Sequence, residues 1–183
     1  MPSKPRFTGL AGAVLAGLLL AIPSLHAEQA PNGYRSAEFG MSSEQVKAKL
    51  EEDGVVETSV EQSPDGDLII DGHLADPGKE DTGVRYVFPA GSDRLALVVE
   101  FHPDADAVGR VQDGLEQRFG EPWADDLAGW WFEQLKDDMP AEARHLVVWG
   151  GGADSRNRFV RLWIFEDYLS VEYLDTALLS GRQ

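Results

Sequence analysis

At two places in this chain the spacing of the apolar residues changes from helical to strand-like, and this pattern limits the folds that the chain can adopt. Over residues 42–54 they recur at every third or fourth position, which is typical of a helix with one apolar side. Over residues 55–101 they alternate with polar residues, which is typical of strands. The same change recurs over residues 104–173. The sequence therefore predicts helices and strands in separate runs, which is the α+β class.

The first helix has clear start and stop signals. Ser42 can cap its N-terminus, and Gln45 can reach back to complete a capping box. Val46 and Leu50 lie one helical turn apart on a shared face, and Gly54 can end the helix in a left-handed conformation that other residues resist. Four strands are then expected to form an antiparallel meander, over residues 55–61, 67–74, 84–88 and 95–101.

The second half of the chain repeats this order. A helix is expected to begin at Asp104 or Asp106 and to end at Gly120, because the apolar residues in between are three and four positions apart. Residues 127–135 also fit a helix, although the aromatic block at residues 130–132 would suit a strand. Three closing strands are expected over residues 145–149, 159–165 and 168–173.

These elements favour a two-layer sandwich, in which the helices pack on one face of an antiparallel sheet. The order of a helix followed by strands occurs twice, so it also fits two helix-plus-strands halves with one layout. No residue-level repeat accompanies this order.

The N-terminus has the three parts of a signal peptide. Lys4 and Arg6 precede an uncharged apolar stretch over residues 10–22, and Pro23-Ser24-Leu25-His26-Ala27 follows it. Cleavage near Ala27 would leave residues 28–183 as a single α+β domain. We therefore expect a periplasmic or secreted protein.

The composition of the chain limits the kinds of partner and membrane attachment that we expect. The apolar stretch of the leader is shorter than the roughly 20 residues that a membrane-spanning helix needs. The chain has no cysteine, so it offers neither a disulfide nor the attachment site of a bacterial lipoprotein. Its formal net charge of −16 repels nucleic acid and anionic lipid surfaces. We expect no membrane span, no lipid anchor and no nucleic-acid partner.

No pattern of residues predicts a catalytic, cofactor or metal site. His73, His102 and His145 are far apart in the sequence and lack the spacing of zinc ligands. The glycine-rich run at residues 150–155 lacks the lysine of a phosphate loop and is interpreted as a hairpin turn. Weak calcium binding by acidic pairs remains an alternative, at Asp104 and Asp106, Asp125 and Asp126, and Asp137 and Asp138.

Two short runs carry a resemblance to a known family. They are Phe39-Gly40-Met41-Ser42-Ser43-Glu44-Gln45-Val46, with Leu50 and Gly54, and Leu115-Glu116-Gln117-Arg118-Phe119-Gly120-Glu121-Pro122. Both resemble helix signals of small exported bacterial proteins such as the outer-membrane assembly protein BamE (SmpA/OmlA) and its relatives of the beta-lactamase-inhibitor-like fold. The resemblance implies a non-enzymatic scaffold that binds protein.

Tryptophan is the residue type that points to a binding surface. Exposed aromatic rings often anchor protein or sugar partners, although a tryptophan packed between helix and sheet is the other interpretation. The predicted interaction surface is formed by Trp123, Trp130, Trp131 and Trp149. The sequence thus favours a non-enzymatic binding or accessory protein that recognises another envelope protein. The alternative is a ligand-binding protein or hydrolase that acts on cell-wall glycan or binds a divalent cation.

Overall fold

A computed structural model describes residues 30–75 and 81–181. The expected signal peptide, residues 1–27, lies outside the described residues. The elements are, in chain order, β1 (Gly33–Tyr34), β2 (Ala37–Glu38), α1 (Ser43–Leu50), β3 (Val55–Gln62), β4 (Leu68–Leu74), β5 (Gly83–Phe88), β6 (Leu97–His102), η1 (Ala105–Ala107), α2 (Val108–Phe119), α3 (Asp125–Leu135), η2 (Lys136–Asp138), β7 (His145–Gly150), β8 (Arg158–Ile164), β9 (Leu169–Asp175) and α4 (Thr176–Leu179).

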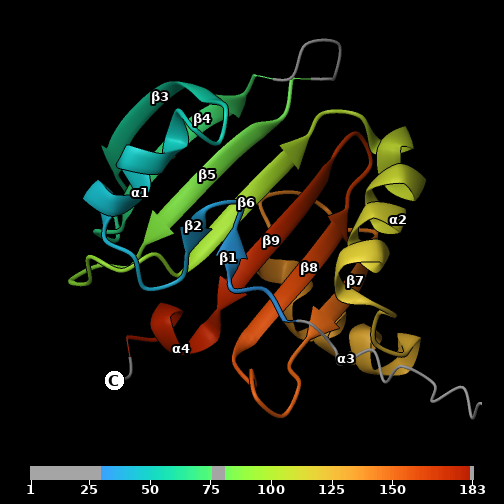
Figure 1. The fold of residues 1–183 in the computed structure, drawn as a ribbon. Helices are drawn as coiled ribbons and strands as arrows, with labels where there is room; N and C mark the ends of the chain where they lie inside the picture. The colour runs from blue at the N-terminus through green and yellow to red at the C-terminus, as the bar shows by residue number, and fades with distance from the viewer. Residues whose placement is uncertain (1–29, 76–80, 182–183) are drawn as a thin grey trace, which may run out of the picture.

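One antiparallel sheet of seven strands dominates the fold (Figure 1). Its strand order is β3-β4-β5-β6-β9-β8-β7, so two meanders lie side by side and join where β6 pairs with β9. A separate two-stranded hairpin, β1-β2, crosses in front of the sheet in Figure 1. The α+β class, the four-strand meander and the three closing strands are thus confirmed.

The two halves share the layout expected from the sequence. Each half begins with a helix, continues as a meander and ends at the centre of the sheet, because the last strands, β6 and β9, pair antiparallel. The first strands, β3 and β7, therefore form the two edges of the sheet. The second half differs from the first in having three strands instead of four and two further helices, α3 and α4.

Both predicted helix signals are present. The Ser42 side chain accepts a hydrogen bond from the Gln45 amide, and the Gln45 side chain accepts one from the Ser42 amide, which completes the capping box. Asp104 caps the short η1 turn, so the helix proper, α2, begins at Val108 rather than at Asp104 or Asp106. Gly120 ends α2 with a φ of 83°, in the region where glycine is favoured.

The larger apolar core lies between the sheet and the layer formed by α1, α2 and the β1-β2 hairpin. Val46 and Leu50 of α1 and Leu115 and Phe119 of α2 are buried there. Tyr34 of β1 reaches into the same core, where its ring contacts Tyr86 of β5 and Tyr173 of β9. Burial of these side chains is the main source of stability available, because the chain has no disulfide.

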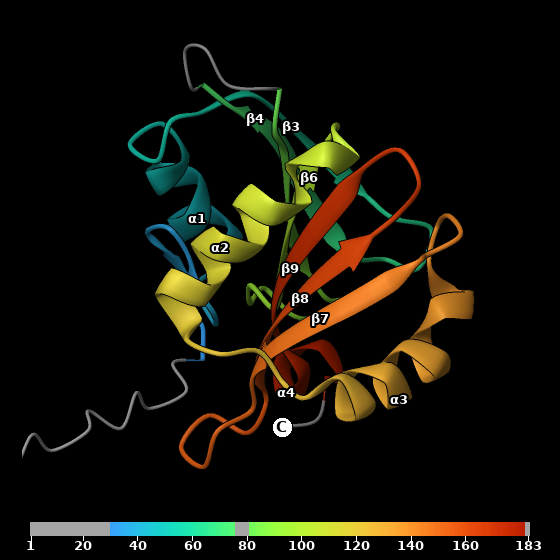
Figure 2. The ribbon, with the colours of Figure 1, turned by 90° about the vertical axis from the view of Figure 1, so that its right-hand side faces the viewer.

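Helix α3 packs on the other face of the sheet, which corrects the expectation that the helices lie on one face (Figure 2). Successive residues of a strand point to opposite faces. In β7, Val147 and Trp149 face the larger core, whereas Leu146 and Val148 face α3. Strands that are apolar on both sides need cover on both sides, and α3 supplies the second cover.

The first half of the sheet is more polar on the α3 side. There Arg85 donates two hydrogen bonds to Asp71, at 2.7 and 2.9 Å, across neighbouring strands. The apolar cluster beneath α3 draws its buried strand residues from β7, β8 and β9 instead. Within residues 30–75 and 81–181, no helix combines the length and apolarity that crossing a membrane requires.

Candidate interaction surface

The four predicted tryptophans do not form one surface. Trp130 lies on α3 with 61% of its surface exposed, more than any other large apolar residue described. Trp123 and Trp131 are half-buried beneath and beside it. These three belong to the side of the sheet that α3 covers.

Trp149 is wrongly placed in the predicted surface. Only 1% of it is exposed, and it belongs to the larger core on the opposite face from α3. Its indole N–H donates to the Gly120 carbonyl at 3.1 Å, so β7 is tied to the end of α2. The reason is the alternation of β7, which turns Trp149 away from α3 and towards the layer of α1 and α2.

Three aromatic rings form a rigid base under α3. The Trp123 and Trp131 ring centroids are 5.1 Å apart, and both rings also contact Phe159 of β8, at 5.7 and 5.0 Å. Edge-to-face and tilted arrangements of this kind are favourable beyond the area they bury. The Trp123 indole N–H donates to the Gly150 carbonyl at 2.9 Å, which fixes this ring. We call Trp123, Trp131 and Phe159 the aromatic base.

Two apolar side chains point outward from α3. Leu127, with 48% of its surface exposed, and Trp130 lie three positions apart on the helix and so on one face. Ala128, Phe132 and Leu135 occupy the inner face of α3. They pack in the smaller apolar core, which lies between α3 and the sheet. Leu127 was not part of the predicted surface, and its spacing of three positions from Trp130 is the sequence signal that could have added it. We call Leu127 and Trp130 the exposed apolar pair.

Acidic side chains accompany the exposed apolar pair. Glu133 of α3 is exposed and forms an ion pair with Lys136 at 2.8 Å. The other acidic residues of this segment are also exposed; they are Asp125, Asp126, Asp137 and Asp138. The segment formed by α3 and η2 therefore presents two exposed apolar side chains together with five exposed acidic ones.

A cluster of buried polar residues lies under the β1-β2 hairpin, on the opposite side of the sheet. The Tyr173 hydroxyl donates to the Glu100 carboxylate at 3.3 Å, and His102 Nε2 lies 3.7 Å from the same carboxylate. Burial, and next the nearby Glu100 charge, raise the pKa of Tyr173 well above its usual value. Burial also raises the pKa values of Tyr34 and Tyr86. These phenols therefore remain protonated; the Tyr173 hydroxyl donates to Glu100, the Tyr34 hydroxyl accepts a hydrogen bond from Arg35 at 3.4 Å, and the buried Tyr86 hydroxyl has no hydrogen-bond partner among the described residues.

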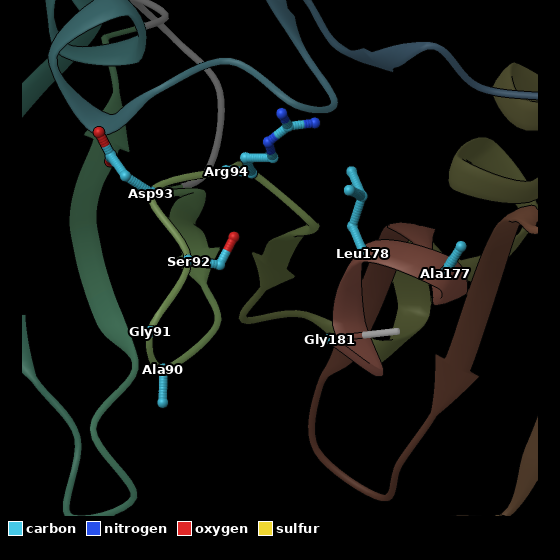
Figure 3. A pocket seen from close by; sticks show the side chains of 8 residues that line it. All are labelled: Ala90, Gly91, Ser92, Asp93, Arg94, Ala177, Leu178 and Gly181. Carbon is cyan, nitrogen blue, oxygen red and sulfur yellow. The ribbon is translucent and has the colours of Figure 1, made fainter. Parts of the chain in front are cut away.

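A shallow hollow of about 490 Å³ lies between the loop after β5 and helix α4 (Figure 3). Its polar side chains are Ser92, Asp93 and Arg94. The Asp93 carboxylate already accepts a hydrogen bond from the Ser43 amide at 2.8 Å, so it serves to hold α1. Small side chains and backbone form most of the remaining wall, as Figure 3 shows.

The acidic pairs considered for calcium do not converge. Within the part of the chain that the structure describes, no group of three or more histidine, aspartate or glutamate side chains could hold a metal ion. Asp104 accepts the amide of Asp106 at 2.8 Å, and Asp126 accepts that of Leu127 at 2.9 Å. These carboxylates therefore act at the starts of helical segments.

Comparison of the chain with models of protein families, with curated proteins and with solved structures finds no match. The case for a function therefore rests on the surface chemistry described above.

Proposed function

We propose that the protein is an exported, non-enzymatic binding protein of the bacterial envelope, and that it docks on another envelope protein through the outer face of α3. One observation carries the proposal. Leu127 and Trp130 are exposed side by side, with 48% and 61% of their surfaces in solvent, on a helix whose inner face is already packed. These two side chains are not needed to hold α3 on the sheet, so a partner can bury them and gain the hydrophobic free energy.

The aromatic base makes this pair effective as an anchor. Interface residues that contribute most to affinity are often tryptophans at the centre of a well-packed patch. A rigid support lowers the conformational entropy that is lost on binding. Trp131 sits directly beside Trp130 in the sequence and is fixed against Trp123 and Phe159, so the helix presents Trp130 without rearrangement.

The exposed acidic residues of the α3 segment indicate the partner's chemistry. Asp125, Asp126 and Asp137 are exposed on this segment, and the formal net charge of the chain is −16. A matching partner has an apolar cleft for Trp130 with lysine or arginine at its margin. Complementary charges of this kind raise the association rate and select the partner.

Export of the chain and its place in the periplasm or outside the cell are part of the same proposal. The basic and apolar run that ends near Ala27 supports them. The resemblance of residues 39–46 and 115–122 to BamE-like proteins supports a scaffold that binds protein rather than an enzyme.

The test is affinity capture from envelope extract with three forms of the purified protein. These are the wild type, Trp130→Ala, and the control Gln134→Ala, which changes another exposed residue of α3. Loss of a central tryptophan should reduce recovery of the true partner by at least about tenfold. The Gln134→Ala form should recover it as the wild type does. Circular dichroism should give the same spectrum for all three forms.

Charge alone can also recover proteins on such an acidic chain. Proteins held by charge are released as salt is raised and are recovered equally by Trp130→Ala and the wild type. If every recovered protein behaves in this way, the proposed role of α3 is wrong.

A further inference from the structure

The two edges of the sheet differ in how their backbone groups are used. At the β7 edge, the Val148 carbonyl accepts the Trp123 amide at 2.8 Å, and the Gly150 carbonyl accepts the Trp123 indole N–H at 2.9 Å. That edge is therefore covered by the segment leading to α3. At the other edge, β3 pairs with β4, and no other described residue pairs with its outer side.

The hydrogen-bond pattern shows which groups of β3 are free. In an antiparallel pair, residues that exchange backbone hydrogen bonds alternate with residues whose backbone groups point away from the partner strand. The Ser63 amide donates to the Asp67 carbonyl at 2.9 Å, which makes Ser63 a bonded position. Glu61 is the next bonded position along the register. The amides and carbonyls of Val60 and Gln62 therefore point outward, away from β4.

The pairing on the far side of β4 supports the same assignment. The Leu74 amide donates to the Thr82 carbonyl at 2.9 Å, so Leu74 faces β5. Every second residue back along β4 faces β5 as well, which includes Ile70. Ile70 lies opposite Val60, and these two residues are therefore not bonded to each other.

The side chains of β3 are unusually exposed for a strand. Val60 and Val56 have 51% and 43% of their surfaces in solvent, and they lie on opposite faces because a bulge follows Val56. Glu57 within the bulge has a φ of 53°, and it and Glu61 are exposed. An open edge with apolar side chains is a template for an added strand. The bulge confines this template to residues 59–62.

We propose that the outer edge of β3 accepts an extended, cationic segment of a partner protein as an added strand. Backbone pairing with Val60 and Gln62 would supply the affinity, and the side chains beside the strand would supply the specificity. The exposed Val60 offers an apolar contact on one face, and on the other face the exposed Glu61 carboxylate, which lies 3.9 Å from Arg85, offers a contact for a cation of the segment. The segment that fits alternates apolar residues with lysine or arginine.

The charge of β3 selects this occupant over a second copy of the chain. Two copies paired antiparallel through residues 59–62 would place the Glu61 side chain of one opposite the Glu61 side chain of the other. Like charges opposite each other on paired strands are destabilising. A cationic segment instead finds an acid on the strand and a protein of net charge −16 behind it. This surface lies at the opposite end of the sheet from α3 and does not depend on the role proposed for α3.

The probe for the test is a short synthetic peptide that alternates valine and lysine. Its control is the same peptide with an N-methyl group on every backbone amide, so that neither of its edges has a free N–H group. Both peptides carry the same charge, but only the first can form a strand ladder. In NMR measurements of amide hydrogen exchange, the Val60 and Gln62 amides should become protected by the first peptide alone.

Two substitutions of Val60 test whether the peptide pairs with the outer edge of β3. Val60→Pro removes the outward N–H without removing a bond to β4, since proline is tolerated at that kind of edge position. Val60→Thr keeps the N–H and the branched side chain. We expect Val60→Pro to weaken binding of the valine-lysine peptide by roughly tenfold and Val60→Thr to bind as the wild type does.

Three results would overturn the proposal. Equal binding of the two peptides would show attraction by charge alone. Protection at residues outside β3 would place the contact elsewhere. A molecular mass in light scattering that doubles in the wild type and not in Val60→Pro would identify a second copy as the occupant.

Discussion

Glu172 of β9 holds two neighbours in the sheet that would otherwise lack a partner. Its carboxylate accepts hydrogen bonds from the Arg161 Nε at 2.7 Å and from the Trp163 indole at 2.9 Å. All three side chains are largely buried, and Trp163 is completely so. Removal of the carboxylate would leave a cation and an N–H group inside the protein without their acceptor.

We therefore expect Glu172→Ala to lower the free energy of unfolding by about 3 kcal/mol, because breaking a mostly buried ion pair leaves one charge uncompensated. Glu172→Gln keeps an acceptor and should cost less. Urea denaturation of both variants and the wild type measures the difference. A loss for Glu172→Ala below about 1 kcal/mol, the value of an exposed ion pair, would contradict this role.

For single residues, the sequence indicates which residue types could form a binding surface but not which way their side chains point. Trp130 and Trp131 are neighbours on α3, yet one is exposed and the other belongs to the aromatic base. A rotation of one residue along a helix turns a side chain by about 100°. Since the side of α3 that faces the sheet is decided by packing, the tryptophans of the candidate surface could not be separated from the sequence.

Helix α1 is an element whose start is held from two directions. The capping box of Ser42 and Gln45 is local and was predicted from their spacing. The second support comes from the loop after β5, where the Asp93 carboxylate accepts the Ser43 amide at 2.8 Å. No short-range pattern signals this contact, because Ser43 and Asp93 are brought together by the fold.

The Asp93 contact should make stability depend on pH. The hydrogen bond from the Ser43 amide, and next that from the Ser43 side chain, lower the pKa of Asp93 below its usual 3.8. A lowered pKa in the folded state means that the stabilisation is present above pH 3.8 and is lost as the pH falls through the lower value. Asp93→Ala should therefore have a lower Tm than the wild type at neutral pH, and the difference should shrink below pH 3.8.

The control for this measurement is Asp113→Ala, which removes the same charge from an exposed position of α2. Its difference from the wild type should not follow the pH dependence of Asp93→Ala. A Tm difference for Asp93→Ala that stays constant from pH 7 to pH 2 would show that the carboxylate does not support α1 through its charge.

The sequence predicted elements more successfully than their arrangement. Capping residues, glycine stops and alternation located both helices and the seven main strands to within a few residues. The prediction that α3 packs on the same face as the other helices was wrong. A strand such as β7 is apolar on both faces, so the face that a helix covers can be assigned only once its neighbours in the sheet are known. The edge at β3 likewise depends on strand order.

The whole molecule is one sheet with one shared core rather than two independent halves. Six residue pairs join β6 to β9, and the larger core draws side chains from both halves. Tyr34, Tyr86 and Tyr173 meet there, with Tyr34 centred 6.4 Å from Tyr86 and 5.0 Å from Tyr173. Neither half could bury these rings alone.

We therefore expect both halves to unfold in a single transition. All 5 tryptophans lie in the second half, so their fluorescence reports on that half, whereas far-UV circular dichroism reports on the strands of both. The two signals should give the same urea midpoint, which is the test of two-state unfolding. A fluorescence midpoint that differs from the circular dichroism midpoint would show that the halves unfold separately.

The place of Tyr34 also bears on when the protein can fold during its synthesis. A ribosome releases a chain from the N-terminus, so Tyr34 emerges early and its neighbour Tyr173 emerges among the last residues. The ring contact between them cannot form in a nascent chain that still lacks β9. The larger core, which needs Val171 and Tyr173 of β9, is therefore completed only after β9 has left the ribosome.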